Sequence, residues 1–273
     1  MTEKIIKSIK HTFIPDHRLI DPEERRLVAE PFYFPGQNDK AVLLIHGWTS
    51  VPYEVRRLGL FLNGRGYTAA GPVLRGHGTV PKDLETVRWT EWLADMEQEY
   101  LALKAQYANV YIAGTSIGAN IAALLAEKHA DVAGLVLMAM PYRFKLERLA
   151  QGFARFASLF KKYNKKFYPP TFGVSTTITR LIAYQSYPIK SAFEAFELIK
   201  RSRVALRGIK QPVLVLQSSH DHMVVKDNLE IIFRELGSGK KAKRYVAKAY
   251  HTFVSDIKNE HVFEDILDFL EHN

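Results

Sequence analysis

Apolar runs and amphipathic stretches alternate along most of this chain of 273 residues. Runs typical of buried strands occupy six ranges: 41–45, 67–72, 110–113, 132–138, 212–216 and 244–249. Apolar residues at helical spacing occupy four others: 52–63, 90–106, 119–128 and 262–271. Two more short strands are predicted near 11–14 and 29–34. Strands that alternate with helices in this way predict an α/β domain with a mostly parallel central sheet flanked by helices.

The alternation stops at residue 141 and returns at Pro212. The segment 141–204 is rich in aromatic residues and holds thirteen Lys or Arg against three acidic residues, a net charge of +10. The whole chain carries +9, so the remainder is close to neutral at −1. We interpret residues 141–204 as a basic, aromatic cap that is inserted into a core domain formed by residues 1–140 and 205–273.

A predicted helix in the cap has one apolar face, because Leu149, Phe153, Phe156 and Phe160 follow one another at offsets of four, three and four. This stripe could pack onto the core domain. It could also form the underside of a lid that lines an acyl-chain pocket, with a basic outer face drawn to anionic lipid. We favour the lid, and lipid attraction is a further hypothesis. The basic and aromatic run 161–168 has a pattern also found in single-strand nucleic-acid sites, but so short a patch favours a solvated loop, and no nucleic-acid partner is expected.

Composition excludes several other chemistries. The chain has no cysteine, so it has no disulfide, no thiol nucleophile and no thiolate metal site. Neither a His-Glu-x-x-His spacing nor a glycine-rich phosphate-binding motif occurs, so no metal and no other cofactor is expected. No apolar stretch approaches the roughly 18 residues of a membrane span, and residues 1–10 lack the apolar centre of a secretory signal. We therefore expect a cytoplasmic protein.

A serine lies at a sharp turn between a predicted strand and a predicted helix. The motif Gly114-Thr115-Ser116-Ile117-Gly118 follows the strand at 110–113 and precedes the helix at 119–128. Small residues on both sides of Ser116 let strand and helix approach closely, so the backbone can hold the hydroxyl out for attack. Such a turn is also an ordinary connector in α/β proteins, so the motif alone leaves both interpretations open.

Two residues further along the chain favour the catalytic interpretation. Asp221 follows the strand at 212–216, and His251 follows the strand at 244–249. The order serine, acid, histidine is that of the α/β-hydrolases and differs from the orders in chymotrypsin and subtilisin. We predict Ser116 as nucleophile, Asp221 as triad acid and His251 as base. Rival acids are Asp227 and Asp256.

An oxyanion also needs a pair of backbone N–H donors, and the turn after the strand at 41–45 can supply one of them. His46-Gly47-Trp48-Thr49 would run beside the nucleophile, and the N–H groups of Trp48 and Ile117 fit the two donor positions. Another histidine, His77, lies in the loop Arg75-Gly76-His77-Gly78. It precedes Ser116 and is surrounded by turn residues, so we interpret it as structural.

With these residues placed, the chain resembles the bacterial carboxylesterase and monoacylglycerol lipase group of the α/β-hydrolases. The likeness rests on five motifs: Leu43–Thr49, Arg75–Gly78, Gly114–Gly118, His220–Val224, and His251 with Ser255-Asp256. It covers residues 41–140 and 212–271. Position by position, it implies the same roles for Ser116, Asp221, His251, Trp48 and Ile117. Many members have Phe where this chain has Trp48, a larger ring that would narrow the acyl pocket.

Together these observations predict a serine hydrolase that cleaves small-molecule carboxylic esters through an acyl-enzyme intermediate. The aromatic cap favours short to medium acyl esters or monoacylglycerols as substrates. Thioester, amide and peptide hydrolysis use the same triad and remain alternatives. Dehalogenation would need a carboxylate at position 116. A ligand receptor without catalysis places no demand on the triad, so the presence of all three members argues against it.

Overall fold

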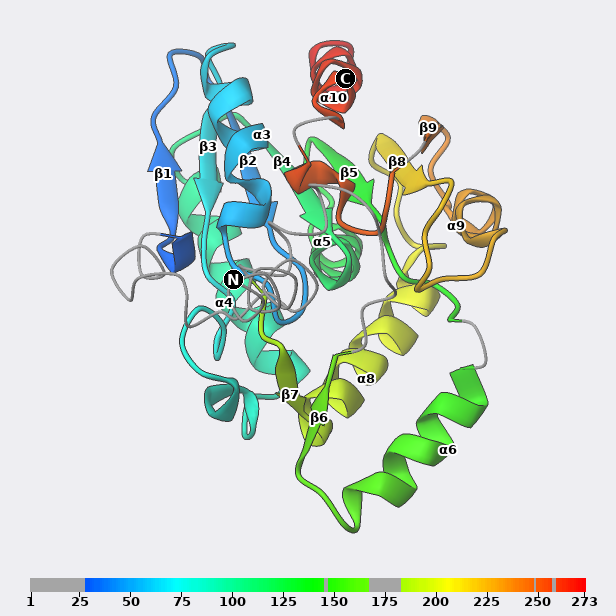
Figure 1. Cartoon of the computed structure of the whole chain (residues 1–273). Coiled ribbons are helices and arrows are strands. Elements are labelled where there is room, and N and C mark those ends of the chain that lie inside the picture. The colour runs from blue at the N-terminus through cyan, green and yellow to red at the C-terminus, as the bar shows by residue number, and fades with distance from the viewer. Residues whose placement is uncertain (1–27, 145–146, 167–182, 248, 257–258) are drawn as a thin grey trace, which may run out of the picture.

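The computed structural model describes residues 28–144, 147–166, 183–247, 249–256 and 259–273 (Figure 1). The strand predicted near 11–14 lies outside these residues, as does the side chain of Phe153. Seven strands form the central sheet: β1 (Phe32–Phe34), β2 (Lys40–Ile45), β3 (Thr68–Gly71), β4 (Asn109–Thr115), β5 (Gly134–Met138), β8 (Val213–Ser218) and β9 (Lys241–Val246). Their order in the sheet is β1-β3-β2-β4-β5-β8-β9. Only β1 is antiparallel to its neighbour in this sheet, which confirms the predicted mostly parallel fold.

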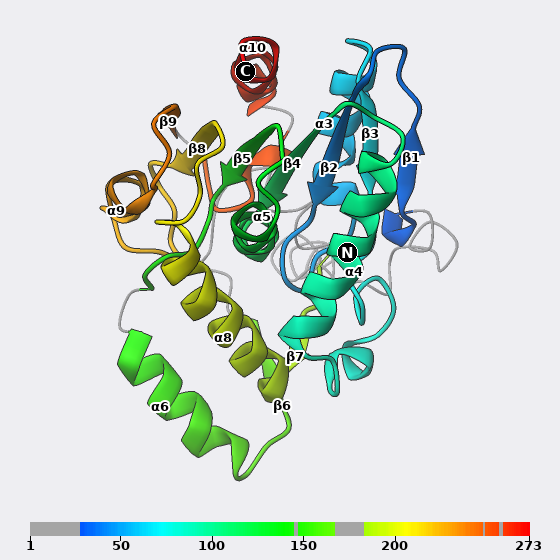
Figure 2. The same ribbon diagram turned by 180° about the vertical axis from the view of Figure 1, so that it is seen from behind.

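Helices cover both faces of this sheet (Figures 1 and 2). The helices of the described residues are α3 (Tyr53–Asn63), α4 (Trp89–Lys104), α5 (Ile117–Lys128), α6 (Glu147–Ser158), α8 (Ile189–Ala205), α9 (Asn228–Glu235) and α10 (His261–Glu271), with short 3-10 turns at Pro81–Leu84 and Phe253–Ser255, and all of these helices except α6 pack against the sheet. Buried side chains of α4, α5, α8 and α9 form one apolar cluster with the sheet, and those of α3 and α10 form another. The sheet is therefore buried on both sides, as a parallel sheet requires.

Alternation along β2 shows how one strand serves both clusters. Leu43 and Ile45 belong to the cluster on the α5 side, whereas Val42 and Leu44 belong to the cluster on the α3 side. Successive side chains of a strand point to opposite faces, so a strand buried on both sides must be apolar at nearly every position. The continuous apolar runs in the sequence have this cause.

Two predicted strands differ in their bounds from the observed ones. The last strand spans Lys241–Val246 rather than 244–249, so His251 is carried on a loop instead of the end of the strand. Lys241–Tyr245 are mostly exposed or half-buried, because this is an edge strand, and the apolar pattern used for the prediction is therefore weak there. At the other edge, β1 begins at Phe32 and not at residue 29.

The predicted cap contains α6, the two-stranded sheet of β6 (Tyr163–Lys165) and β7 (Ser186–Pro188), and most of α8. Helix α8 packs against α5 through Leu198 and Ile199, which are fully buried in the main apolar cluster. Helix α6 lies on the far side of α8 from the sheet (Figures 1 and 2). The assignment of residues 141–204 to a cap stays a proposal. The last helix of this segment, α8, packs as part of the core domain.

The apolar stripe of α6 does not pack onto the core domain. Leu149, Phe156 and Phe160 are 69%, 62% and 77% exposed. Packing of this stripe onto the core domain is therefore contradicted for these three side chains, whereas its role as the underside of a lid stays a prediction. Helical spacing identifies the side chains that share a face, but it does not say what that face meets.

Two glycines allow α5 to start directly against the sheet. A Cβ on Gly118 would lie 2.3 Å from the carbonyl oxygen of Ile45, and a Cβ on Gly114 would lie 2.2 Å from that of Gly118. Any side chain at either position would push the first turn of α5 away from β2 and β4. The glycines of the serine motif are thus required by close backbone contacts.

We predict that Gly118→Ala lowers the free energy of unfolding by roughly 1–3 kcal/mol or more, because a methyl group must displace backbone atoms. The matched control is Gly239→Ala, since a Cβ there meets no atom within 4 Å, and it should change stability by less than about 0.5 kcal/mol. Urea denaturation measures both. Equal stabilities of the two variants would contradict the close-contact account.

Candidate active site

Ser116 occupies a strained turn between β4 and α5. Its backbone angles are φ 51° and ψ −124°, a left-handed conformation that residues other than glycine rarely adopt. The N–H of Ser116 donates to the carbonyl of Met138 on the neighbouring strand β5 at 2.9 Å, which holds the turn in place. The side chain is half-buried at the carboxyl edge of the sheet.

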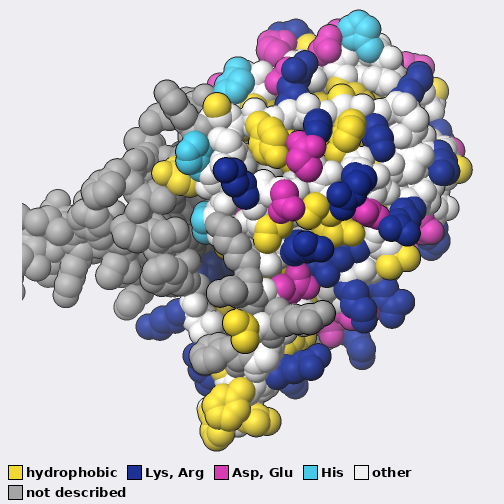
Figure 3. Space-filling view, turned by 90° about the vertical axis from the view of Figure 1, so that its right-hand side faces the viewer, with side chains coloured by type: hydrophobic (Ala, Val, Ile, Leu, Met, Phe, Trp, Pro, Cys, Tyr) yellow, Lys and Arg dark blue, Asp and Glu magenta, His cyan; other side chains and the backbone are white. Residues whose placement is uncertain are grey.

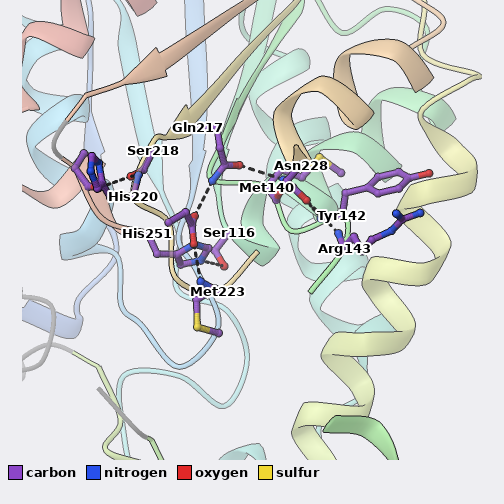
Figure 4. Close-up of polar contacts among 12 residues, drawn as sticks. Ser116, Met140, Tyr142, Arg143, Gln217, Ser218, His220, Met223, Asn228 and His251 are labelled. Carbon is purple, nitrogen blue, oxygen red and sulfur yellow. Dashed lines mark hydrogen bonds and ion pairs between the residues drawn. The ribbon is translucent and has the colours of Figure 1, made fainter. Parts of the chain in front are cut away.

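His251 meets Ser116 at this edge (Figure 4), and Asp221 is hydrogen-bonded to His251. The Nε2 atom of His251 lies 3.0 Å from Oγ of Ser116, and its Nδ1 atom lies 2.7 Å from Oδ2 of Asp221. A carboxylate can only accept, so Nδ1 carries the proton and Nε2 of the neutral ring is free to accept the serine proton. Two side chains that are 30 and 135 positions away from His251 therefore form one continuous hydrogen-bonded chain with it.

The electrostatics of the pair match this arrangement. Burial alone would raise the pKa of Asp221, but the charge and hydrogen bond of His251 outweigh burial and hold that pKa below its usual value. Burial alone would lower the pKa of His251, but the charge and hydrogen bond of Asp221, aided by Glu54, raise it above its usual value. Each partner thus favours the charged form of the other.

The buried side-chain amide of Gln217, which the sequence patterns did not single out, holds Asp221 together with the backbone N–H of Met223; Figure 4 shows Gln217 and Met223. Nε2 of Gln217 donates to Oδ2 of Asp221 at 2.6 Å, and the N–H of Met223 donates to Oδ1 at 2.8 Å. Nδ2 of Asn228 in turn donates to Oε1 of Gln217 at 3.2 Å, which fixes the orientation of the Gln217 amide. These hydrogen bonds fix the position of the Asp221 carboxylate.

Asn228 also joins the acid to the start of the predicted cap. Its Nδ2 donates to the carbonyl of Met140 at 2.8 Å, and its Oδ1 accepts from the N–H groups of Tyr142 and Arg143 at 3.1 Å. This fully buried amide thereby uses both of its ends. No sequence signal marks Asn228 apart from its place just after the Asp221 loop, because a single Asn is common at helix starts.

The loop after β2 reaches the nucleophile from the other side. The carbonyl of Gly47 accepts from Nδ1 of His46 at 2.9 Å and from the N–H of Ser50 at 3.2 Å. Because the Leu74 N–H donates to Nε2 of His46 at 3.0 Å, the proton of the neutral ring is on Nδ1. Burial lowers the pKa of His46 to about 4, so the ring is neutral near pH 7. His46 is therefore a fixed donor to the loop.

The predicted oxyanion donors lie at the expected elements. Ile117 is the first residue of α5, and the first N–H groups of a helix have no partner within the helix. Trp48 follows Gly47, and its half-buried indole packs against Tyr187 of β7 with ring centres 4.7 Å apart. The assignment of both N–H groups to the oxyanion stays a proposal.

Tyr184 of the predicted cap also holds the loop that follows β2. The N–H of Tyr184 donates to the carbonyl of Thr49 at 2.8 Å, and the Tyr184 hydroxyl accepts from the N–H of Thr79 and donates to the carbonyl of Gly76. Thr49 has a φ of 62°, so this contact supports a strained residue. The segment before β7 thus ties the two loops around the site together.

His77 and the rival acids are placed elsewhere. The buried His77 ring donates from Nδ1 to the carbonyl of Arg75 and stacks on Tyr184, which agrees with a structural role. Asp227 precedes α9, and Asp256 accepts from Asn259. Among the described residues, Asp221 is the acid whose hydrogen bond to His251 the structure shows.

A cleft of about 570 Å³ lies between α6 and α8, away from the catalytic group. Its lining comes from these two helices: Glu147, Gln151, Arg155, Phe193, Glu194, Phe196, Glu197, Lys200 and Arg203. None of the proposed catalytic residues contributes to it. Within the described ranges, no three His, Asp or Glu side chains are grouped as a metal site would need, and no helix has the length and apolar character to cross a membrane.

Comparison with known proteins agrees with this geometry. Residues 36–258 match the model of the family described as serine aminopeptidase, S33. A carboxylesterase of Bacillus subtilis (strain 168) is 30% identical over 247 residues, which cover 90% of this chain and 97% of the relative. A thermostable monoacylglycerol lipase of Bacillus sp. (strain H-257) is 29% identical over 243 residues, or 88% and 94% of the two chains.

Among solved structures, one described under the metagenome-derived lipolytic enzymes LipS and LipT superposes with a TM-score of 0.81. It is 26% identical and covers 90% of this chain and 98% of its own. The chain therefore belongs to the serine aminopeptidase S33 family, and the predicted resemblance to the α/β-hydrolases is confirmed. By class it is a carboxylic ester hydrolase of the α/β-hydrolase fold.

We predict that kcat/KM rises with pH, with a midpoint above the ordinary histidine value of 6.5. Asp221 raises the pKa of His251, and the predicted base is the neutral form of His251, so activity should be lost as pH falls through that raised value. Asp221→Asn removes the negative charge that raises the pKa of His251, so the midpoint should move to lower pH while kcat falls by about 10³- to 10⁴-fold. A pH–rate profile of both proteins measures this, and an unmoved midpoint would contradict the pairing.

Proposed function

We propose that this protein hydrolyses carboxylic esters by two-step acyl transfer at Ser116. His251 takes the proton of Ser116 as Oγ attacks the ester carbonyl, and Asp221 orients the imidazole and stabilises its charged form. The N–H groups of Trp48 and Ile117 hold the oxyanion of the tetrahedral intermediate. His251 then protonates the leaving alcohol, and water releases the acid by the same steps in reverse.

The observation that carries this proposal is the pair of hydrogen bonds at His251, 3.0 Å to Ser116 and 2.7 Å to Asp221. Both lie within the range in which a proton can pass between heavy atoms. The strained backbone of Ser116 supports the same role, since strain of this kind persists where surrounding structure maintains it for a function.

For the substrate, we propose short to medium acyl esters or monoacylglycerols. The support comes from the names of the two curated relatives, a carboxylesterase and a monoacylglycerol lipase. Cleavage of amides or peptides is the second candidate, and the name of the matched family favours keeping it. The same triad can serve either reaction, so only measured rates separate them.

We predict that Ser116→Ala lowers kcat for ester hydrolysis by about 10⁴-fold or more, because it removes the attacking atom. The test compares p-nitrophenyl esters and monoacylglycerols of increasing chain length with aminoacyl amides of matched size. Thermal unfolding should change little, which separates lost chemistry from lost folding.

Higher kcat/KM on the amides would replace the ester assignment with a peptidase. No turnover of any substrate by the folded wild-type protein, with Ser116→Ala indistinguishable from it, would favour a ligand receptor on the same fold. Full activity of Ser116→Ala would remove Ser116 as the nucleophile.

We also propose that the tip of the cap contacts lipid. Phe156, Leu159 and Phe160 are 62–77% exposed there, and the rings of Phe156 and Phe160 lie 5.2 Å apart. Exposed Lys161, Lys162 and Lys165 follow directly. Figure 3 shows a hydrophobic cluster at this lower end of the molecule with basic side chains above it. Apolar side chains flanked by cations suit a membrane surface that contains anionic lipid.

We predict that replacing Lys161, Lys162 and Lys165 by Ala weakens binding to anionic vesicles by at least tenfold, since each cation near such a surface contributes about 1 kcal/mol. The control removes three exposed cations around α9, namely Lys226, Arg234 and Lys240, and should bind almost as wild type. Vesicle sedimentation measures both. Equal loss in the two variants would mean that net charge alone drives binding, and no loss in either would remove the lipid proposal.

A further inference from the structure

Glu54 is a buried carboxyl group that the proposed mechanism leaves unused. It lies in the first turn of α3, and only 1% of its surface is exposed. Oε2 of Glu54 accepts from the N–H of Gly47 at 2.7 Å, a short bond to a residue beside the proposed oxyanion donor. Burying a carboxyl costs several kcal/mol unless it is hydrogen-bonded or paired, so its presence at this place requires an explanation.

Glu54 also lies close to the nucleophile. A Cβ on Gly47 would be 3.2 Å from Oε2 of Glu54 and 3.3 Å from Cβ of Ser116. Gly47 therefore lies between the carboxyl group and the serine, and a larger residue there would be tightly packed against both. The start of α3 adds a favourable field, because the N-terminus of a helix stabilises negative charge.

The hydrogen bonds around Gly47 fix two consecutive peptide groups. In a trans peptide, the N–H and C=O of one group point in opposite directions. The Gly47 carbonyl is held by His46 and Ser50, so the N–H of Trp48 in the same peptide group must point the other way. The peptide group before Gly47 is held by Glu54 through the Gly47 N–H.

The hydrogen bond between the Gly47 N–H and Glu54 is needed because residue 47 is a glycine. Gly47 lacks a Cβ and so has the widest choice of backbone angles, and rotation about its own bonds would swing the following peptide group. A hydrogen bond on each side of Gly47 removes this freedom. An oxyanion donor must be aimed before the reaction, because its effect depends on being in place without reorganisation.

We propose that Glu54 is a positioning residue for the oxyanion loop: by accepting the hydrogen bond from Gly47, it aims the N–H of Trp48 at the developing oxyanion. This inference rests on the proposed catalytic function of Ser116 and Trp48. Glu54 touches neither substrate nor the reacting atoms, and it acts through the backbone of Gly47.

The pKa of Glu54 is shifted in the way that is typical of carboxyl groups at functional sites. Burial raises the pKa of Glu54, whereas the Gly47 N–H and the nearby positive charges of His251 and Lys166 act to lower it, and the net direction is upward. Perturbed carboxyl groups of this kind gather at functional sites. A group that served only to start α3 would be equally effective at the helix surface, where ionisation costs little.

The test compares two variants of one residue. Glu54→Leu fills the space but cannot accept a hydrogen bond, so kcat should fall about 10- to 100-fold, part of the effect of losing an oxyanion donor, with KM within about threefold. Glu54→Gln keeps an acceptor oxygen and should retain kcat within about threefold. Leu62→Ala is the control: it leaves a cavity in the same helix, so it should lower thermal stability without lowering kcat of the folded protein.

A third variant keeps the test decisive if Glu54→Leu does not fold. Glu54→Asp is shorter by one methylene and withdraws the carboxyl from Gly47, so it should lose kcat as Glu54→Leu does. The proposal is overturned if Glu54→Leu or Glu54→Asp has wild-type kcat, if Glu54→Gln loses as much kcat as Glu54→Leu, or if only KM changes. Ser116→Ala is run alongside: activity remaining in that variant would refute the catalytic proposal, whereas an inactive Ser116→Ala beside an active Glu54→Leu would refute only the role of Glu54.

Discussion

The contact between the first turn of α5 and the end of β2 constrains the whole catalytic edge. Gly118 lies directly against the carbonyl of Ile45, so the turn at Ser116 and the loop that begins at His46 are pressed together. Ser116 takes a left-handed backbone conformation in this turn, and a Cβ on Gly47 would lie only 3.3 Å from Cβ of Ser116. Strand order then brings the loops of Asp221 and His251 to the same edge.

Around this contact, polar groups are buried in hydrogen-bonded sets. Asp221 accepts from His251, Gln217 and Met223, so its charge is distributed over three donors. Neutral His46 links two loops through its two ring nitrogens. Hydrogen-bonded networks of this kind rigidify a site. Contacts of Asn228 and Tyr184 extend this rigidity to the start of the predicted cap and to the segment before β7.

Much of this was predictable from sequence, because parallel strands buried on both faces leave continuous apolar runs and turn residues mark their ends. Ser116, Asp221 and His251 could be found in this way, although β9 was misplaced since an edge strand is only partly apolar. The exposure of Phe156 and Phe160 could not be predicted, because periodicity does not identify what a face meets. Gln217, Asn228 and Glu54 carry no local motif, and their roles depend on contacts between distant segments.

The central claim is that an oxyanion formed at Ser116 is held by the N–H groups of Trp48 and Ile117. A crystal structure of the protein after reaction with an alkyl phosphonate tests it most directly, since the phosphoryl oxygen takes the place of the oxyanion. The account predicts a covalent bond to Oγ of Ser116 and a phosphoryl oxygen about 2.7–3.1 Å from both nitrogens. A phosphonate bonded to another residue, or an oxygen directed away from both N–H groups, would contradict it.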